Sequence, residues 1–269
     1  MQPDSISHGA LKSESEHRSD ICAVGRWIHD RGYVAATDGN ISVRLGPDRI
    51  LVTPTSISKG MMTPDDLVIM DLQGRRVGGL RKPSSELAMH LLIYRLRPDV
   101  NSVCHAHPPT ATGYAAAGIA LDKPILCELV IGLGCIPVAR YGTPGTSELS
   151  AAIEPYVQGH DAILMANHGV VTYGPDLLTA FLRMETTEHF ARVALVTQLL
   201  GKQVLLSGRD VEKLVEVRAR YGANGATAAS SALDDSSNAD AGSTESVTLT
   251  RRELGVLIDE AVRRDRSHR

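Results

Sequence analysis

The chain has 269 residues, a formal net charge of −3 and 43% hydrophobic residues. Because a general nucleic-acid binder needs a basic surplus, this balance excludes that class. Glu, Gly or Pro interrupts the apolar runs well before the roughly 18 residues that a membrane span needs, and the polar first 20 residues lack the apolar core of a secretory signal. We therefore expect a cytoplasmic protein with four reduced cysteines and neither a nucleic-acid nor a membrane partner.

Composition divides the chain into four parts. Residues 1–18 are polar and predict a flexible tail, whereas residues 19–222 have ordinary globular composition and predict one domain. Residues 223–247 are almost entirely small and polar, so they predict a disordered Ala/Ser/Gly linker. Residues 248–269 begin with capping-box spacing and carry one apolar stripe, which predicts an amphipathic helix.

Hydrophobic periodicity and turn residues predict the elements of the domain in chain order. The expected helices cover residues 20–32, 84–98, 109–118, 146–159, 176–200 and 211–221. The expected strands lie within residues 37–45, 49–55, 101–108 and 136–142, with hairpins in 68–77 and 161–174. Strands come in runs and helices surround them, which favours an α/β fold with a largely antiparallel sheet.

Three histidines are candidate metal ligands. His105 and His107 are two residues apart in an expected strand, so both side chains leave the same face. His168 follows the apolar strand AILMA, in an Asn-His-Gly turn. Three imidazoles from two strand ends suit a catalytic zinc ion with an open position. The competing interpretation is that they are unrelated strand-end histidines.

Small polar turns and one acidic residue surround these histidines in the sequence. Glu86 opens the helix before the His105 strand, where it is either a capping residue or a fourth ligand and general base. The turns expose backbone N–H groups and hydroxyls that can bind a phosphate, although turn formation alone also explains each of them. The candidate phosphate-binding residues are Gly39, Asn40, Thr55, Ser84 and Ser85.

Taken together, these segments resemble the class II, zinc-dependent sugar-phosphate aldolase and adducin family over about residues 20–222. The motifs are DGNIS, TPT, SSE, HAHP, YGTPGTSEL and NHG, in that order. The closest pattern is that of the L-fuculose-phosphate aldolases. The resemblance implies a three-layer α/β/α fold with a central, largely antiparallel sheet.

The resemblance also implies roles for individual residues. His105, His107 and His168 would bind one Zn²⁺ per subunit, and Glu86 would bind the ion at rest and take the proton when substrate arrives. A C-terminal tyrosine of the family matches Tyr221. At the position of a second family tyrosine this chain has Glu128, which becomes the candidate acid/base.

The implied activity is reversible cleavage of a ketose 1-phosphate, such as L-fuculose 1-phosphate, to dihydroxyacetone phosphate and an aldehyde such as L-lactaldehyde. A 4-epimerase or a decarboxylase of the same fold is an alternative. Epimerases of the family typically have Asp where this chain has Glu86, which favours cleavage. An adducin-like structural module is the non-enzymatic alternative, but such relatives lack the metal ligands present here.

The resemblance further implies a homotetramer with sites between subunits, so Glu128 or Tyr221 would act in a neighbour's site. An aldolase domain, a linker and a terminal amphipathic helix together resemble enzymes packaged in bacterial microcompartments. We therefore predict that residues 248–269 are an encapsulation peptide for a shell protein, with a solvated tail or an oligomer contact as the alternative. We expect Lys59 and Lys82 to be surface charges.

Overall fold

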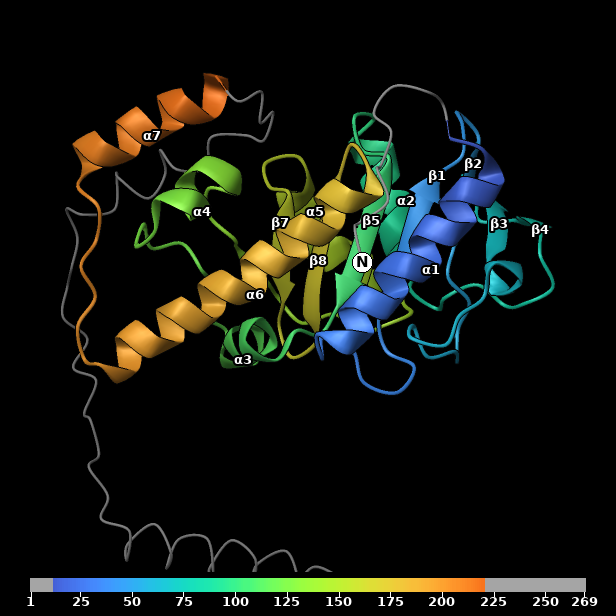
Figure 1. Ribbon diagram of the computed structural model, residues 1–269, viewed down its shortest axis with the longest axis horizontal. Helices are drawn as coiled ribbons and strands as arrows, with labels where there is room; N and C mark the ends of the chain where they lie inside the picture. Colours follow the sequence, from blue (N-terminus) through green and yellow to red (C-terminus); the bar gives the residue numbers. More distant parts are fainter. Residues whose placement is uncertain (1–11, 221–269) are drawn as a thin grey trace, which may run out of the picture. The chain divides into compact units, whose positions relative to one another are not determined.

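The computed structural model describes residues 12–220, and its centre is one eight-stranded sheet (Figure 1). The strand order is β4-β3-β2-β1-β5-β8-β7-β6. All neighbouring pairs are antiparallel except β6 and β7, which are parallel. The strands are β1 Asn40–Arg44, β2 Arg49–Val52, β3 Val68–Asp71, β4 Arg76–Gly78, β5 Ser102–Ala106, β6 Val138–Ala139, β7 Ala162–Met165 and β8 Gly169–Gly174.

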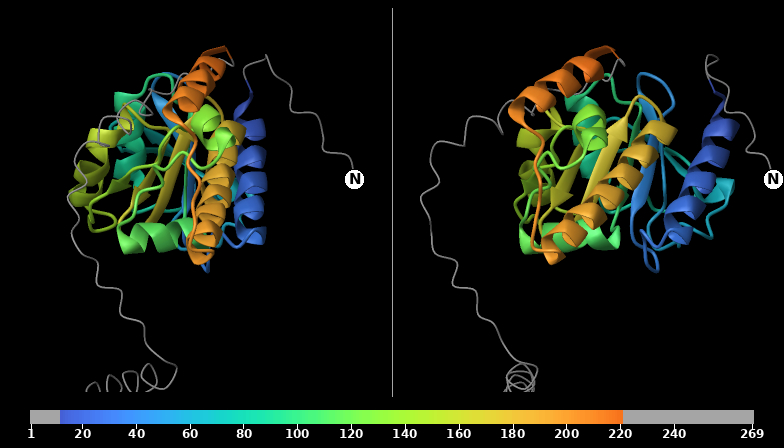
Figure 2. Two further views of the ribbon diagram at one scale, coloured as in Figure 1. Left: turned by 90° about the vertical axis from the view of Figure 1, so that its left-hand side faces the viewer. Right: turned by 60° about the vertical axis from the view of Figure 1, so that its left-hand side comes forward.

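Helices cover both faces of this sheet, and each face has its own apolar core. One core contains residues of α1, α3, α4 and α6, and the other contains residues of α2 and α5. Figure 2 shows α1 and α6 together on one side of the sheet. The expected α/β/α layers with a largely antiparallel sheet are therefore confirmed. The helices are α1 Glu14–Asp30, η1 Pro64–Asp66, α2 Leu87–Leu96, α3 Pro109–Ala117, α4 Cys127–Gly132, α5 Ser147–Val157, α6 Leu177–Leu199 and α7 Gly208–Arg220.

The first helix begins at Glu14, upstream of the expected end of the tail at residue 18. Ser13 and Glu16 form a reciprocal capping box, in which the Ser13 N–H donates to Glu16 Oε2 at 2.7 Å and the Glu16 N–H donates to Ser13 Oγ at 3.3 Å. Such a cap contributes about 1 kcal/mol and satisfies two free N–H groups. The polar residues just before residue 18 therefore form an exposed first helical turn, which capping hydrogen bonds stabilise instead of apolar contacts.

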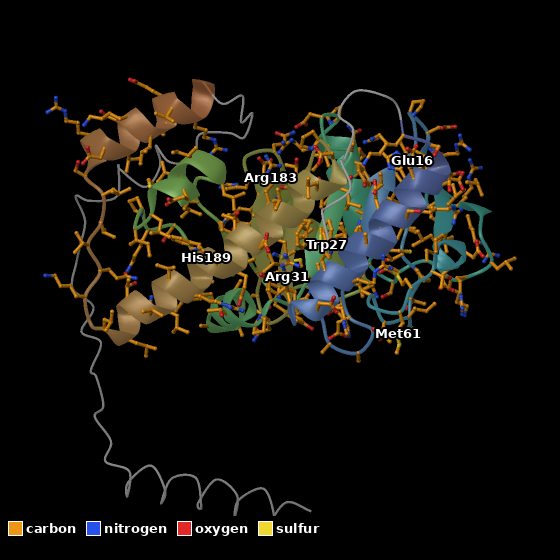
Figure 3. The ribbon with its side chains drawn as sticks, in the orientation of Figure 1. Glu16, Trp27, Arg31, Met61, Arg183 and His189 are labelled. Atoms are coloured by element: carbon orange, nitrogen blue, oxygen red, sulfur yellow. The ribbon has the colours of Figure 1, made fainter. Side chains whose placement is uncertain are left out.

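The long helix α6 packs against α1 across the face of the sheet. Figure 3 shows Trp27 and Arg31 on the part of α1 that faces α6. The Trp27 ring lies 5.3 Å from that of Phe181, and Arg31 Nε donates to Glu185 Oε1 at 2.6 Å. The two later helices have capped N-termini: Thr146 accepts a hydrogen bond from the Glu148 N–H in α5, and Asp176 accepts one from the Thr179 N–H in α6.

The prediction that Lys59 is a surface charge is wrong. Lys59 is 1% exposed, and its Nζ donates to the carbonyl oxygens of Thr37 at 2.9 Å and Ile57 at 2.8 Å. The ammonium group thus connects the loop before β1 to the loop after β2. Burial lowers the pKa of Lys59 to about 8. No local pattern indicates this burial, because the carbonyl groups come from two separate loops.

All four cysteines are free thiols, and within residues 12–220 no helix combines the length and apolarity needed to cross a membrane. The predicted linker at 223–247, the helix at 248–269 and most of the tail at 1–18 lie outside the described residues. They stay predictions.

Candidate metal and active site

Three histidines from two separate segments of the sequence converge at one end of β5, β7 and β8. His105 lies in β5, His107 follows that strand, and His168 lies in the turn between β7 and β8. Each offers a ring nitrogen, and these atoms all lie within 4.8 Å of one another. The ring centroids are 4.8 to 5.1 Å apart. These three residues are called the histidine cluster below.

The pairing of β5 with its two neighbours positions the cluster. His105 is opposite Val171 of β8 and opposite Asn40 of β1. Its Nδ1 lies 2.8 Å from the carbonyl oxygen of Val170. A ring N–H donated to that carbonyl leaves the Nε2 lone pair directed at the cluster, which is the tautomer a metal ligand requires.

Glu86, at the start of α2, adds a carboxylate to the histidine cluster. It is the N-cap residue of α2 and is 7% exposed, and its N–H donates to Ser84 Oγ at 3.2 Å. Its Oε2 lies 3.2 Å from His105 Nε2, and its Oε1 lies 3.1 Å from His168 Nε2. The capping interpretation of Glu86 is incomplete, because its side chain makes no cap hydrogen bond and points to the histidine cluster instead.

Electrostatics keep this carboxylate ionised. Burial by itself raises the pKa of Glu86, but the neighbouring His105 and His168 rings outweigh burial, so the net pKa is lowered. Burial also lowers the pKa of His107 to about 3, and the neighbouring histidines add to that effect. A neutral His107 and an ionised Glu86 are the protonation states in which both groups bind a cation.

The residues fit a divalent metal ion. Glu86 Oε1 is a buried atom without a hydrogen-bond partner in the described part of the chain. Such unsatisfied atoms are rare in folded proteins and often mark a missing ion or water. Three imidazole nitrogens and one carboxylate oxygen are ligands that zinc and similar first-row ions accept. The cluster is therefore consistent with a divalent metal site.

The structure brings several expected phosphate-binding turns together beside α2. A bridge joins Pro54 to Pro83, and the Ser84 N–H donates to the carbonyl oxygen of Thr53 at 3.1 Å. The Thr55 N–H donates to the carbonyl oxygen of Lys82, also at 3.1 Å. The turn after β2 is thus adjacent to the Ser84-Ser85 turn that precedes Glu86. The Ser84-Ser85 turn leads directly to Glu86, which contacts the histidine cluster.

Gly39 and Asn40 are less accessible. Gly39 has φ +72° and leaves no room for a side chain, since a Cβ there would lie 2.8 Å from the His105 carbonyl oxygen. The Asn40 side chain is 4% exposed and bonded at both ends: its Nδ2 donates to Glu86 Oε2 at 2.7 Å, and its Oδ1 lies 2.5 Å from His90 Nε2. Its side chain therefore contacts the catalytic candidate rather than an open phosphate site.

Glu128, the candidate acid/base, does not join the cluster in the described part of this chain. Glu128 is exposed in the first turn of α4 and accepts a hydrogen bond from Cys127 Sγ at 3.2 Å. Across residues 12–220, no hydrogen bond or ion pair joins it to the histidine cluster. Tyr221 lies outside the described residues.

Sequence reasoning missed several groups around the site. Asp38 Oδ2 lies 3.6 Å from His107 Nδ1, and His90 contacts both Asn40 and Ser42. Spacing offered one usable signal: His90 is four residues after Glu86 on the same helix, and such residues share a face.

Comparisons with known proteins agree with this geometry. A 5-deoxy-D-ribulose 1-phosphate aldolase of Bacillus thuringiensis serovar kurstaki is 33% identical over 209 residues, covering 77% of this chain and 97% of that protein. An L-fuculose phosphate aldolase of Methanocaldococcus jannaschii is 37% identical over 188 residues, covering 69% of this chain and 99% of that protein. A solved structure of an L-fuculose 1-phosphate aldolase superposes with a TM-score of 0.71 at 30% identity, covering 77% and 98%.

Other relatives have different names at similar identity. They include a 3-oxo-tetronate 4-phosphate decarboxylase of Haemophilus influenzae, 34% identical over 65% of this chain and 85% of that protein. A methylthioribulose-1-phosphate dehydratase of Methylococcus capsulatus is 33% identical, covering 66% and 92%. Residues 19–195 match the family described as Class II Aldolase and Adducin N-terminal domain. With the fold, the histidine cluster and this match in agreement, the chain belongs to the class II aldolase and adducin N-terminal domain family.

Proposed function

We propose that this protein is a zinc-dependent aldolase that reversibly cleaves a ketose 1-phosphate to dihydroxyacetone phosphate and an aldehyde. The observation that supports the proposal is the placement of Glu86, whose two carboxylate oxygens lie 3.1 and 3.2 Å from the Nε2 atoms of two cluster histidines. An adducin-like structural role would not require three histidines and a buried carboxylate to converge. The aldolases among the relatives also favour cleavage.

Each residue of the site has a role in this reaction. His105, His107, His168 and Glu86 would bind the ion, which when bound supplies Lewis acidity toward the oxygens of the substrate. In the direction of synthesis, Glu86 removes a proton from C3 of dihydroxyacetone phosphate. As the new C–C bond forms, a second acid protonates the aldehyde oxygen. Cleavage is the reverse of these steps.

The substrate phosphate would bind at the paired turns beside α2. The hydroxyls of Thr55, Ser84 and Ser85 and the backbone at Gly39 are small polar groups close to Glu86 along the chain or in space. A phosphate held there places the adjacent carbon atoms toward the histidine cluster. Asn40 was included in this set from the sequence, but its side chain is already bonded to Glu86 and His90.

Glu128 and Tyr221 are proposed as the second acid. Glu128 is exposed on α4, so it would have to act in the site of a neighbouring subunit. This proposal requires the predicted homotetramer. The predicted docking of residues 248–269 to a microcompartment shell protein is independent of the chemistry.

A decarboxylase is the second candidate function. Two relatives are named 3-oxo-tetronate 4-phosphate decarboxylase, at 34% and 31% identity. A decarboxylase also develops negative charge next to a carbonyl group, so the same metal and phosphate sites would serve it. The two reactions differ in the group that leaves: a decarboxylase releases carbon dioxide, and an aldolase releases an aldehyde.

Product analysis tests the proposal. The zinc-loaded protein is incubated with the 1-phosphates of fuculose, rhamnulose, ribulose, 5-deoxyribulose and methylthioribulose, and with 3-oxo-tetronate 4-phosphate. We expect dihydroxyacetone phosphate and an aldehyde from at least one ketose 1-phosphate. Carbon dioxide from the keto acid alone would support the decarboxylase, and pentose phosphate interconversion alone would overturn the aldolase proposal.

A matched variant connects that activity to the site. Glu86→Gln keeps the size of the side chain but removes the base, so we expect kcat to fall by roughly 10²- to 10⁴-fold. Glu148→Gln is the control, because Glu148 is an exposed residue whose carboxylate contacts only its own turn, at Thr143. Equal activity of both variants would contradict the assigned role of Glu86.

A further inference from the structure

A continuous chain of buried hydrogen bonds runs from Glu86 away from the metal site. Asn40 Nδ2 lies 2.7 Å from Glu86 Oε2, and Asn40 Oδ1 lies 2.5 Å from His90 Nε2. His90 Nδ1 lies 2.6 Å from Ser42 Oγ, which lies 2.8 Å from the Tyr94 hydroxyl. We call Asn40, His90, Ser42 and Tyr94 the relay; none of the four is more than 4% exposed.

The sheet and helix α2 explain why these groups meet. In β1, Ile41 and Val43 belong to the core on the α1 and α6 face, so Asn40 and Ser42 point to the opposite face, where α2 packs. On α2, His90 and Tyr94 are four residues apart and therefore share one face. The relay is thus a row of polar side chains between β1, at the centre of the sheet, and α2.

Only one assignment of donors and acceptors satisfies every member when Glu86 is ionised. The carboxylate can only accept, so Asn40 must turn its NH₂ group to Glu86 and its oxygen to His90. His90 Nε2 must then carry the hydrogen. Burial lowers the pKa of His90 to about 3, so the ring is neutral and its Nδ1 accepts. Ser42 consequently donates to His90 and accepts from the Tyr94 hydroxyl.

We propose that the relay positions the Glu86 carboxylate by fixing the orientation of the Asn40 amide. His90, Ser42 and Tyr94 are positioning residues, and Asn40 transmits their effect. The amide donates to Oε2, so the carboxylate cannot rotate and Oε1 stays directed at the metal site. If the amide turned over, its oxygen would face the carboxylate and both the hydrogen bond and the orientation would be lost.

The role of the relay in catalysis rests on the proposed function, whereas its effect on metal binding does not. Groups that orient metal ligands typically change affinity by 10- to 100-fold when they are removed. The relay is several bonds long, so its far end should act only through Asn40. That dependence distinguishes positioning from a general effect on the stability of α2.

The experiment measures zinc affinity by competition with a chromophoric chelator, using the full chain and four variants. Ser42→Ala and Tyr94→Phe each remove one hydroxyl and keep the rest of the side chain. We expect Ser42→Ala to weaken zinc binding roughly tenfold, Tyr94→Phe less, and Asn40→Ala at least as much as Ser42→Ala. In the double variant Asn40→Ala/Tyr94→Phe, we expect no loss beyond that of Asn40→Ala, because the two residues act in series.

Ser102→Ala is the matched control. Ser102 is fully buried in the neighbouring strand β5, and its hydroxyl has no hydrogen-bond partner in the described residues, so zinc affinity should not change. Zinc affinity equal to that of the unmodified protein in Ser42→Ala and Tyr94→Phe would overturn the proposal. So would strictly additive losses in the double variant.

Substrate kinetics separate the relay from the proposed function and from a phosphate role of Asn40. A positioning role lowers kcat in the Ser42 and Asn40 variants and leaves KM within about twofold. A higher KM for Asn40→Ala with unchanged zinc affinity would show that Asn40 binds the phosphate, which overturns the relay. If the unmodified protein cleaves no ketose phosphate while zinc affinity follows the expected series, the proposed function fails and the relay stands.

Discussion

A Cβ atom on Gly169 would lie 2.5 Å from Cδ2 of His107. It would also lie 2.7 Å from the carbonyl oxygen of Ala106 and 3.3 Å from Cε1 of His105. The first residue of β8 thus packs directly against two members of the histidine cluster. The glycine of the Asn-His-Gly motif is required by this close approach, since backbone and a ligand ring occupy the space that a side chain needs.

Gly169→Ala should therefore disrupt the metal site. The added methyl group must displace the His107 ring or separate β8 from β5, which costs about 1–3 kcal/mol of folding free energy. We expect zinc affinity to fall at least tenfold, measured by chelator competition, together with lower stability in urea. Gly159→Ala is the control, because no atom lies within 4 Å of a Cβ there. Unchanged zinc binding by Gly169→Ala would contradict the close approach.

Removing the metal should lower both activity and stability. A ligand that binds only the folded protein stabilises it by about 2.7 kcal/mol at a free concentration 100 times its Kd. We expect chelation to lower Tm and abolish turnover, and zinc to restore both. His107→Ala removes one of the three histidine ligands, so zinc should shift its Tm far less. A Tm shift equal to that of the unmodified protein would place the ion elsewhere.

The buried Lys59 should give the protein a distinct alkaline pH dependence. Its folded-state pKa of about 8 is below the ordinary value of 10.5. Between these values the unfolded chain binds a proton that the folded chain lacks, so this group makes the unfolding free energy rise as the pH increases from about 8 to 10.5. Urea unfolding of Lys59→Met across this range should lack that rise.

Lys59→Met should also weaken substrate binding. Its ammonium group joins the loop that contains Gly39 to the loop that follows Thr55, so its loss removes the donor shared by two partly buried carbonyl groups. We expect a higher KM for the phosphorylated substrate with a smaller change in kcat. The exposed Lys82, replaced by Met, serves as the control for charge. If the unfolding free energy of Lys59→Met has the same pH dependence as that of the unmodified protein, the assigned pKa of Lys59 is wrong.

The start of β7 depends on a buried ion-pair network. Asp161 is 1% exposed, with Oδ1 3.0 Å from Arg97 and Oδ2 2.7 Å from Arg183. Asp161→Asn leaves two guanidinium groups without their shared partner, so we expect a loss of about 3–5 kcal/mol in urea unfolding. Asp99→Asn is the matched control. The Asp99 side chain is 56% exposed, so its pair with Arg97 should contribute at most about 1 kcal/mol.

Asp161→Asn should lower stability without changing the metal site. Asp161 precedes β7, whereas His168 follows that strand, so the network lies at the other end of β7 from the metal site. We expect folded Asp161→Asn to bind zinc as tightly as the unmodified protein. A large loss of zinc affinity would show that the two ends of β7 are coupled.

Local patterns in the sequence determined much of the fold. Alternation identified most strands, and the expected helix starts at residues 146 and 176 agree with the N-caps of α5 and α6. The spacing of His105 and His107 predicted a shared face, and the motif order identified the family. These features depend on interactions within a few residues, so the sequence contains them directly. Helix α4 was not predicted, because its six residues are too few to show a helical period.

Only the tertiary structure decided how distant groups meet. Pairing of β5 with β8 brings His168 to His105, and the packing of α2 on the sheet brings Glu86 to both. The burial of Lys59 and the hydrogen bonds of Asn40 likewise come from segments that are far apart in the sequence. Sequence alone therefore determined which residues are available for chemistry. Their protonation and orientation followed from long-range strand pairing and burial, which no local pattern encodes.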